Sequence, residues 1–255
     1  MKKFFITLLT LFVATSLWAQ QSDNEKEYNG SDVQEGWTFR LSAGYSIGGT
    51  APLPMPREIR AINSYNPGLN YQLGFSARRD FENSKWGVGF GLRIDKKGMS
   101  TDADTKSYHM EAWNSDGKVV GAFTGKVETE VSSYYVTLPM LATYDFSSRW
   151  GVSGGIYLSY LLEGDFKGCA YDGYIRDQNP TGERTDVTRA YYGFGDDLCD
   201  FLWGLQLGCE YSLNRNFDLF ACLQWGMNGI FPSKFKSVTF NLYPIYATFG
   251  VAYAL

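Results

Sequence analysis

Apolar side chains alternate with small or polar ones along most of the chain from Trp37 onward. In residues 86–94, large apolar residues at the even positions are separated by three glycines and Arg93. Because successive side chains of a strand point to opposite faces, this period of two predicts strands with one apolar and one small or polar face. The pattern predicts eight strands, at roughly 37–48, 67–81, 86–97, 127–146, 150–163, 200–213, 217–231 and 237–255.

The connections between these segments alternate in length. Short polar turns are predicted at 82–85, 147–149 and 214–216, whereas long loops are predicted at 49–66, 98–126 and 164–199 and an intermediate one at 232–236. An up-and-down meander then has all its short turns at one end, which is typical of outer-membrane barrels with short periplasmic turns. The predicted fold is all-β, an eight-stranded antiparallel up-and-down transmembrane β-barrel.

An aromatic residue stands at the short-turn end of every predicted strand, on the apolar parity of that strand. Amphipathic rings prefer the lipid headgroup level, so these residues predict an outward-facing aromatic girdle. The alternative is a soluble periplasmic barrel that hides its apolar face inside and encloses an apolar ligand. The girdle comprises Trp37, Phe81, Trp86, Phe146, Trp150, Tyr211, Phe217 and Tyr253.

The opposite parity carries many charged and amide side chains. In a dry core, each such group left unpaired costs about 1–3 kcal/mol, whereas in the lumen of a membrane barrel the groups can pair with one another. Counting from the turns predicts a lumen polar cluster near the periplasmic end. It consists of Arg40, Arg78, Asp145, Glu210 and Asp218. Because eight strands leave room only for side chains, we expect a plugged lumen without an open pore.

The N-terminal residues have the layout of a secretory signal peptide. Lys2 and Lys3 precede an apolar run that ends near Ala19 and is too short to span a bilayer as a helix. The predicted organisation is a signal peptide at 1–19, a flexible periplasmic leader at 20–36 and the outer-membrane barrel domain at 37–255. The leader is expected to be flexible because it contains few apolar residues.

Residues 134–162 contain a distinctive pair of strands. Leu138, Pro139, Met140, Leu141 and Tyr144 precede a short turn, and a glycine-rich strand with Gly154, Gly155, Tyr160, Leu161 and Leu162 follows it. This arrangement resembles the PorT-like outer-membrane beta-barrel family of Bacteroidetes. The resemblance implies an integral outer-membrane barrel, and some members of that family take part in protein secretion. Pro139 lacks an N–H and is expected at a bulge or bend.

Candidate chemistry is sparse. The chain has 23 Lys and Arg against 27 Asp and Glu, a net charge of −4, which argues against a nucleic-acid partner. His109, the single histidine, stands near Ser107 in a predicted outward loop, and this pair is the basis for an alternative function as an outer-membrane lipid hydrolase. A lone histidine is more often a surface residue, so we predict no catalytic, cofactor-binding or metal-ligating residue and no cofactor.

Four cysteines occur in this exported chain. Cys169 and Cys199 bracket the third long loop, where a disulfide could stabilise the fold by roughly 3.6 kcal/mol. The sequence does not decide between this disulfide and two free thiols. Pairing across the turn at 214–216 sets residue 209 near 221 and residue 208 near 222. Cys209 and Cys222 are therefore expected to face opposite sides and not to bond.

The third long loop also holds several aromatic residues, among them Tyr171, Tyr174, Tyr191, Tyr192 and Phe194. They either form an outward recognition surface or fold the loop over the barrel mouth. The sequence thus predicts a non-enzymatic monomer that contacts outer-membrane lipid and whose extracellular loops either bind a protein partner or have a structural role in shielding the surface.

Overall fold

The structure of the chain is a computed structural model that describes residues 36–114, 117–176, 182–232, 234–235 and 240–255. The predicted signal peptide and the leader up to residue 35 lie outside the described residues. In the described part, almost every element is a β-strand. The strands are β1 (Trp37–Pro52), β2 (Ile59–Asn66), β3 (Asn70–Asp80), β4 (Trp86–Asn114), β5 (Gly117–Asp145), β6 (Trp150–Arg176), β7 (Arg184–Gly193), β8 (Phe201–Ser212), β9 (Phe217–Gly226) and β10 (Leu242–Ala254), with one 3-10 turn, η1 (Gly195–Asp197), before β8.

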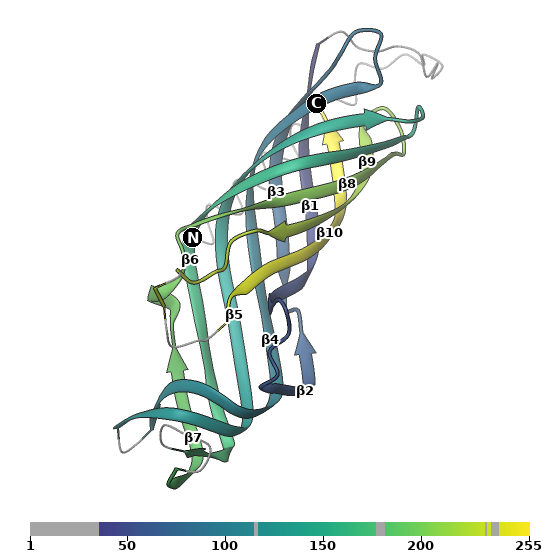
Figure 1. The fold of residues 1–255 in the computed structure, drawn as a ribbon. Helices are drawn as coiled ribbons and strands as arrows, with labels where there is room; N and C mark the ends of the chain where they lie inside the picture. Colours follow the sequence, from purple (N-terminus) through teal and green to yellow (C-terminus); the bar gives the residue numbers. More distant parts are fainter. Residues whose placement is uncertain (1–35, 115–116, 177–181, 233, 236–239) are drawn as a thin grey trace, which may run out of the picture. The chain divides into compact units, whose positions relative to one another are not determined.

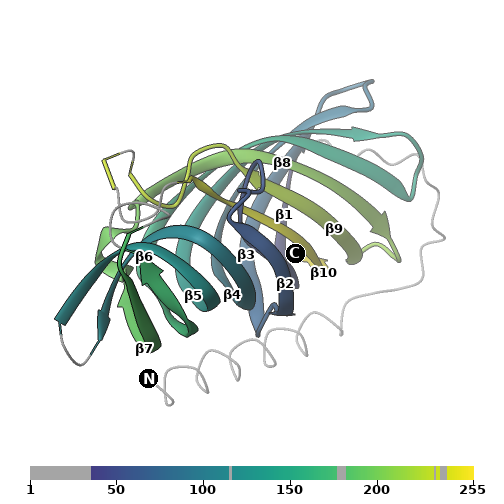
Figure 2. The same cartoon turned by 60° about the horizontal axis from the view of Figure 1, so that its bottom comes forward.

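The strands close into a barrel (Figures 1 and 2). Antiparallel pairing runs in the order β4-β3-β1-β10-β9-β8-β6-β5, and an additional pairing of β5 with β4 completes the ring. β2 and β7 stand outside this ring of eight, since β2 pairs with β4 alone and β7 pairs with β4 and β6. The predicted eight-stranded antiparallel barrel is therefore confirmed, and two further strands were not predicted.

Side chains of β3, β8 and the first half of β4 are arranged as in a membrane barrel. Phe90, Trp203 and Leu205 lie on the exterior and are exposed, whereas Arg78 and Gln206 on the opposite parity are buried inside. Strands of this part therefore present apolar residues outward and polar residues to the lumen, which is the arrangement of a barrel in lipid.

The strands continue much farther than the sequence predicted. β4 and β5 have 29 residues each and β6 has 27, whereas about 9–11 residues cross a bilayer. The loop predicted at 98–126 is wrong, because β4 and β5 pair from the short turn up to Asn114 and Gly117. The loop predicted at 164–199 is also wrong over most of its length, since β6 continues to Arg176 and β7 pairs back onto it.

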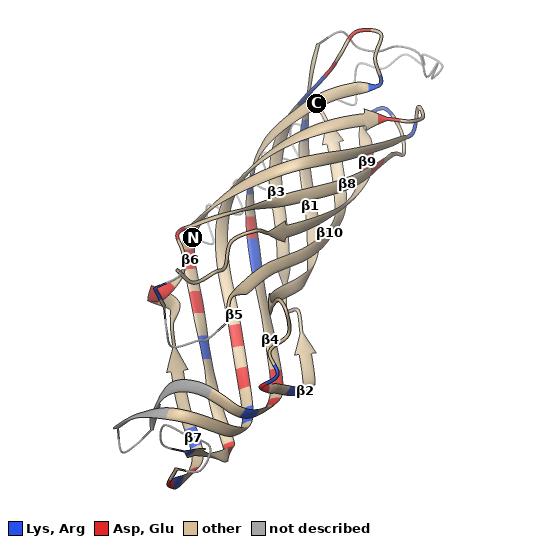
Figure 3. Cartoon of the chain, in the orientation of Figure 1, with Lys and Arg blue, Asp and Glu red and all other residues tan. Residues whose placement is uncertain are grey.

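We call the part formed by residues 98–114 of β4, 117–134 of β5, 163–176 of β6, and by β2 and β7, the outer extension. Here the polarity of the strands reverses. On β5, Val127 and Val131 face inward and are buried, and Glu128 and Glu130 between them are exposed. Figure 3 shows charged bands along these lengths of β5 and β6. The alternation continues, with water in place of lipid outside the strands, so an apolar interior and a charged exterior are favoured.

Pro139 lies within β5 and its side chain is buried. The ladder between β4 and β5 has a gap there, because Phe90 pairs with Met140 and the next pair is Arg93 with Thr137. The register is the same on both sides of the gap. The missing N–H of the proline is thus accommodated by local loss of pairing, without the register shift of a bulge.

Candidate functional site

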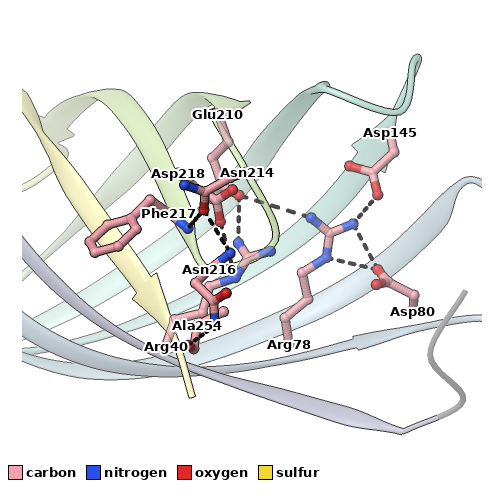
Figure 4. Close-up of polar contacts among 10 residues, drawn as sticks. All are labelled: Arg40, Arg78, Asp80, Asp145, Glu210, Asn214, Asn216, Phe217, Asp218 and Ala254. Atoms are coloured by element: carbon pink, nitrogen blue, oxygen red, sulfur yellow. Dashed lines mark hydrogen bonds and ion pairs between the residues drawn. The ribbon is translucent and has the colours of Figure 1, made fainter. Parts of the chain in front are cut away.

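The five predicted lumen residues meet at the short-turn end of the barrel (Figure 4). Arg40 of β1 donates from Nη1 to Oε2 of Glu210 on β8 over 2.8 Å. Its Nε lies 3.5 Å from Oδ2 of Asp218 on β9. Side chains that are far apart in the sequence are therefore tied across the inside of the ring.

Arg78 of β3 holds the other half of this network. Its Nε donates to Oδ1 of Asp80 over 2.7 Å, its Nη2 donates to Oδ2 of Asp145, and its Nη1 lies 3.9 Å from Oε2 of Glu210. Glu210 thus joins the two arginines into one cluster. Asp80 belongs to the cluster as well and was missed by the sequence analysis, although it has the same strand parity as Arg78.

A second polar network lies deeper in the lumen, centred on Asp95 of β4. The Asp95 side chain is 2% exposed, and its Oδ2 accepts from Nε of Arg93 at 3.1 Å and from Oγ1 of Thr137 at 2.9 Å. The Lys97 Nζ lies 3.7 Å from the same oxygen. A buried carboxylate is tolerated when cations and hydrogen-bond donors surround it, as they do here.

This network reaches the far wall of the barrel. Arg93 donates from Nη1 to Oε1 of Gln206 on β8 over 2.8 Å, and Lys97 donates from Nζ to Oε1 of Gln224 on β9 over 2.7 Å. Gln224 in turn donates from Nε2 to Oε1 of Gln72 on β3 over 3.4 Å. Strands β3 and β4 are thereby connected across the lumen to β8 and β9 on the opposite side of the ring.

Three tyrosine rings surround the ammonium group of Lys97. Its Nζ lies 5.8 Å from the ring centroid of Tyr135, 5.3 Å from that of Tyr157 and 5.4 Å from that of Tyr246. Each ring face attracts a cation, and a desolvated pair of this kind contributes about 2 kcal/mol. Asp95 and Lys97 were missed as site residues, but they follow Arg93 by two and four positions, which places all three on the lumen parity.

The predicted aromatic girdle lies on the exterior at the short turns. Trp37, Phe81, Trp86, Phe146, Trp150 and Phe217 are exposed, and Tyr211 and Tyr253 are half-buried. The two half-buried rings pack against girdle neighbours on adjacent strands, with centroids 4.7 Å apart for Trp150 and Tyr211 and 5.0 Å apart for Phe217 and Tyr253.

An apolar core fills the interior beyond the Lys97 network. Phe123 and Val131 of β5, Phe166 of β6 and Tyr192 of β7 belong to it, together with Phe231 after β9. Phe194 packs on this core, with its ring centroid 6.3 Å from that of Phe166. The two alternatives for the third-loop aromatics therefore hold for different residues. Tyr192 is buried inside, whereas Tyr191 is 59% exposed on the outside.

All four cysteines are free thiols in the structure. The bridge that the sequence left open between Cys169 and Cys199 is absent, because the two residues stand at different heights. Leu161 donates its backbone N–H to Asp200, so Cys199 lies near that level of β6. Cys169 is eight residues farther along β6, roughly 25 Å away at the rise of a strand, whereas a disulfide requires Cα atoms within about 7 Å.

The predicted register around the third short turn is confirmed. Gly208 pairs with Cys222 and Cys209 pairs with Ala221, so the sulfur atoms of Cys209 and Cys222 belong to opposite faces of the sheet.

His109 was predicted in a loop. This prediction is wrong, because the backbone of His109 pairs with Ala122 in the β4–β5 hairpin.

No group of three or more His, Cys, Asp or Glu side chains in the described part of the chain is arranged to hold a metal ion. No helix among the described residues is long and apolar enough to cross a membrane.

A closed antiparallel barrel with an apolar exterior and a charged, hydrogen-bonded lumen defines the class of outer-membrane barrel proteins. The sequence profile described as "Outer membrane protein beta-barrel domain" matches residues 18–232 of this chain. The chain belongs to this family, and its location is the outer membrane. A comparison with curated proteins finds no match.

Solved outer-membrane proteins resemble the chain only distantly. Ail, the attachment invasion locus protein of Yersinia pestis, is 10% identical with a TM-score of 0.38 over 86% of this chain and 97% of its own. OprG from Pseudomonas aeruginosa is 13% identical with a TM-score of 0.33 over 87% and 97%, and Neisserial surface protein A is 12% identical with a TM-score of 0.30 over 89% and 99%. Scores this low carry no conclusion about the function of this chain.

Proposed function

We propose that this protein is a non-enzymatic outer-membrane barrel that conducts no solute through its lumen and binds a protein partner with its outer extension. The observation that carries the proposal is the length of β4, β5 and β6, which have 27 to 29 residues each. Roughly 9–11 of those residues are needed to cross the membrane. The remainder forms a strand-built platform with a core of its own, which a mere membrane anchor does not need.

The lumen supports a role without transport. Lys97 and Gln224 meet across it, and the apolar core closes the interior above them. Below them, Arg40 and Arg78 tie carboxylates from both sides of the ring. A solute that passed along the axis would have to break two ionic networks and displace a packed core. Opening the lumen would also separate Lys97 from Gln224 and Arg40 from Glu210.

The exterior of the extension supports partner binding. Glu130 and Lys167 are both more than half exposed and lie 3.6 Å apart on neighbouring strands, and Tyr191 stands exposed on β7. Paired strands hold these side chains in fixed positions, so a partner would not have to order a flexible loop on binding. An exposed aromatic beside charged residues is a frequent composition of protein interfaces.

Within the family, we place the chain with the PorT-like barrels and propose protein secretion as the process it serves. The motif around Leu138 and Pro139 supports this placement, as does the glycine-rich strand through Gly154 and Gly155, which pairs with that motif in register. Deletion of the gene tests the process. Accumulation of secreted proteins inside the deletion strain supports it, and unchanged secretion contradicts it.

Photo-crosslinking in intact cells tests partner binding directly. A photo-reactive amino acid is placed at Glu130 on the extension or at Asn83 in the turn between β3 and β4, both exposed. We expect a discrete protein adduct from position 130 and none from position 83. The proposal fails if position 130 gives no adduct in cells whose barrel is folded, as judged by altered gel migration without heating.

A further inference from the structure

A cavity of about 330 Å³ lies in the outer extension, between the apolar core and β2. Every described residue that lines it is uncharged. Val127 and Phe166 form part of its buried floor, and Met55, Ile62 and Tyr65 stand on its open side. Binding sites for small molecules have volumes of about 300–1,000 Å³ and predominantly apolar walls, so the size and lining both suit a ligand.

Three hydroxyl groups in the wall already have partners within the protein. Tyr65 donates its hydroxyl to the Gly48 carbonyl over 2.7 Å, Tyr192 donates to the Glu128 carbonyl over 2.8 Å, and Thr105 donates to the Gly125 carbonyl over 3.1 Å. Burial raises the pKa of Tyr108 to about 12, so its hydroxyl stays neutral at physiological pH. The wall therefore offers apolar contact surface, and it contains no charged group that would require a charge on the ligand.

Two irregularities in β2 direct its apolar side chains to this cavity. Ile59 pairs with Thr105, Ile62 with Ala103 and Tyr65 with Thr101, and a register shift separates each pair from the next. In a regular strand, positions three apart point to opposite faces. Each shift adds one residue on β2, so Ile59, Ile62 and Tyr65 all stand beside cavity-lining residues of β4.

The open wall leaves apolar surface in contact with water. Ile62 is 55% exposed, Met55 is 52% exposed and Tyr65 is 47% exposed, although all three line the cavity. Covering such surface contributes about 25 cal/mol per Å². The exposed side also gives a ligand a way in that does not require the barrel to unfold, because β2 pairs only with β4.

We propose that this cavity binds an uncharged hydrocarbon chain. An apolar cavity of about 150 Å³ holds one benzene molecule, so the larger volume here suits an alkyl segment of roughly twice that size. The chain can belong to a free apolar molecule or to the tail of a membrane lipid. This site is separate from the outward-facing residues that we propose for partner binding, and its occupancy does not depend on a partner.

Photoaffinity labelling of the purified full chain in phospholipid nanodiscs tests this site without competing detergent tails. One arm uses a long-chain alcohol that carries a diazirine in its alkyl chain, and the other uses a phospholipid with the diazirine in the same kind of chain. Labelled positions are located by peptide mass spectrometry. We expect labels on Met55, Ile62 or Met99, and the arm that gives them identifies the source of the chain.

Neighbouring residues of β2 provide matched variants, because both are exposed and neither is needed for the barrel. Ile62→Lys places a charge on the cavity wall, and Ala61→Lys places the same charge one residue away, where Ala61 does not line the cavity. We expect at least about a tenfold loss of cavity labelling in Ile62→Lys and none in Ala61→Lys.

A second pair fills the space from β4. Ala103→Trp occupies the cavity, and Ser100→Trp changes the opposite face of the same strand. Loss of labelling in Ala103→Trp but not in Ser100→Trp supports the proposal. Labelling that is absent from the cavity in both arms, or that persists in both Ile62→Lys and Ala103→Trp, overturns it.

Discussion

Lys97 and Gln224 stand on strands from opposite sides of the eight-membered ring, yet Nζ of Lys97 donates to Oε1 of Gln224 over 2.7 Å. The rings of Tyr157 and Tyr246 lie beside the same ammonium group, so four large side chains meet at this level of the lumen. The contact explains why a charged lumen is compatible with a stable barrel. Its charges hold the far walls together.

Replacement of Lys97 tests how much this contact contributes to stability. Lys97→Ala leaves the buried carboxylate of Asp95 with one cation fewer, so the free energy of unfolding should fall by about 3–5 kcal/mol. Lys96→Ala is the matched control, because Lys96 is only half-buried and should cost about 1 kcal/mol or less. Urea titration of folding into lipid vesicles measures both, and equal losses would contradict the assignment.

The cluster at the short turns predicts a rescue. Arg78→Ala leaves Asp80 and Asp145 without their shared cation and should lower the free energy of unfolding by about 3 kcal/mol. Asp145→Asn in the same chain removes one of the stranded charges. A double-mutant cycle should therefore show a coupling of about 0.5–3 kcal/mol. Additive losses would mean that the two side chains do not interact in the folded barrel.

Because the polarity of the exterior changes along β4, its outward face should tolerate a new charge poorly in the lipid-facing part and well in the outer extension. Leu92→Arg places a cation on the lipid-facing exterior and should cost about 2–4 kcal/mol. Ser100→Arg has the same parity in the outer extension and should change stability by less than about 0.5 kcal/mol. If both substitutions are equally costly, the membrane reaches farther along β4 than the change in polarity indicates.

The state of the cysteines is checked by mass. All four thiols are free in the structure, so alkylation of the denatured, unreduced protein should add four labels. Reduction beforehand should change nothing. Two missing labels that reappear after reduction would show a disulfide and would require Cys169 and Cys199 to lie much closer together.

The sequence was sufficient for the part of the fold that lies in lipid. A strict period of two with large apolar residues such as Phe90 and Leu92 is a strong signal, and the short polar turns between strands fixed the pairing of neighbours such as Gly208 and Cys222. Counting from those turns also put Arg40 and Glu210 at one level, because each strand rises by a constant amount per residue.

The outer extension could not be predicted in the same way. Its strands keep the period of two, but beyond the predicted end of β6 at residue 163 the exterior positions carry Asp165 and Lys167, and this loss of apolar residues resembles the end of a strand. The cavity depends on the register shifts in β2, which place Ile59 and Ile62 on one face although they are three positions apart. Such shifts follow from pairing with β4 and leave no trace in a local pattern.

The proposal of a closed lumen is tested most directly by recording current across a planar bilayer that contains the folded chain. We expect no stable conductance, because the Lys97–Gln224 contact and the apolar core above it close the lumen. A steady open-channel current from correctly folded protein, reproducible between preparations, would contradict the account.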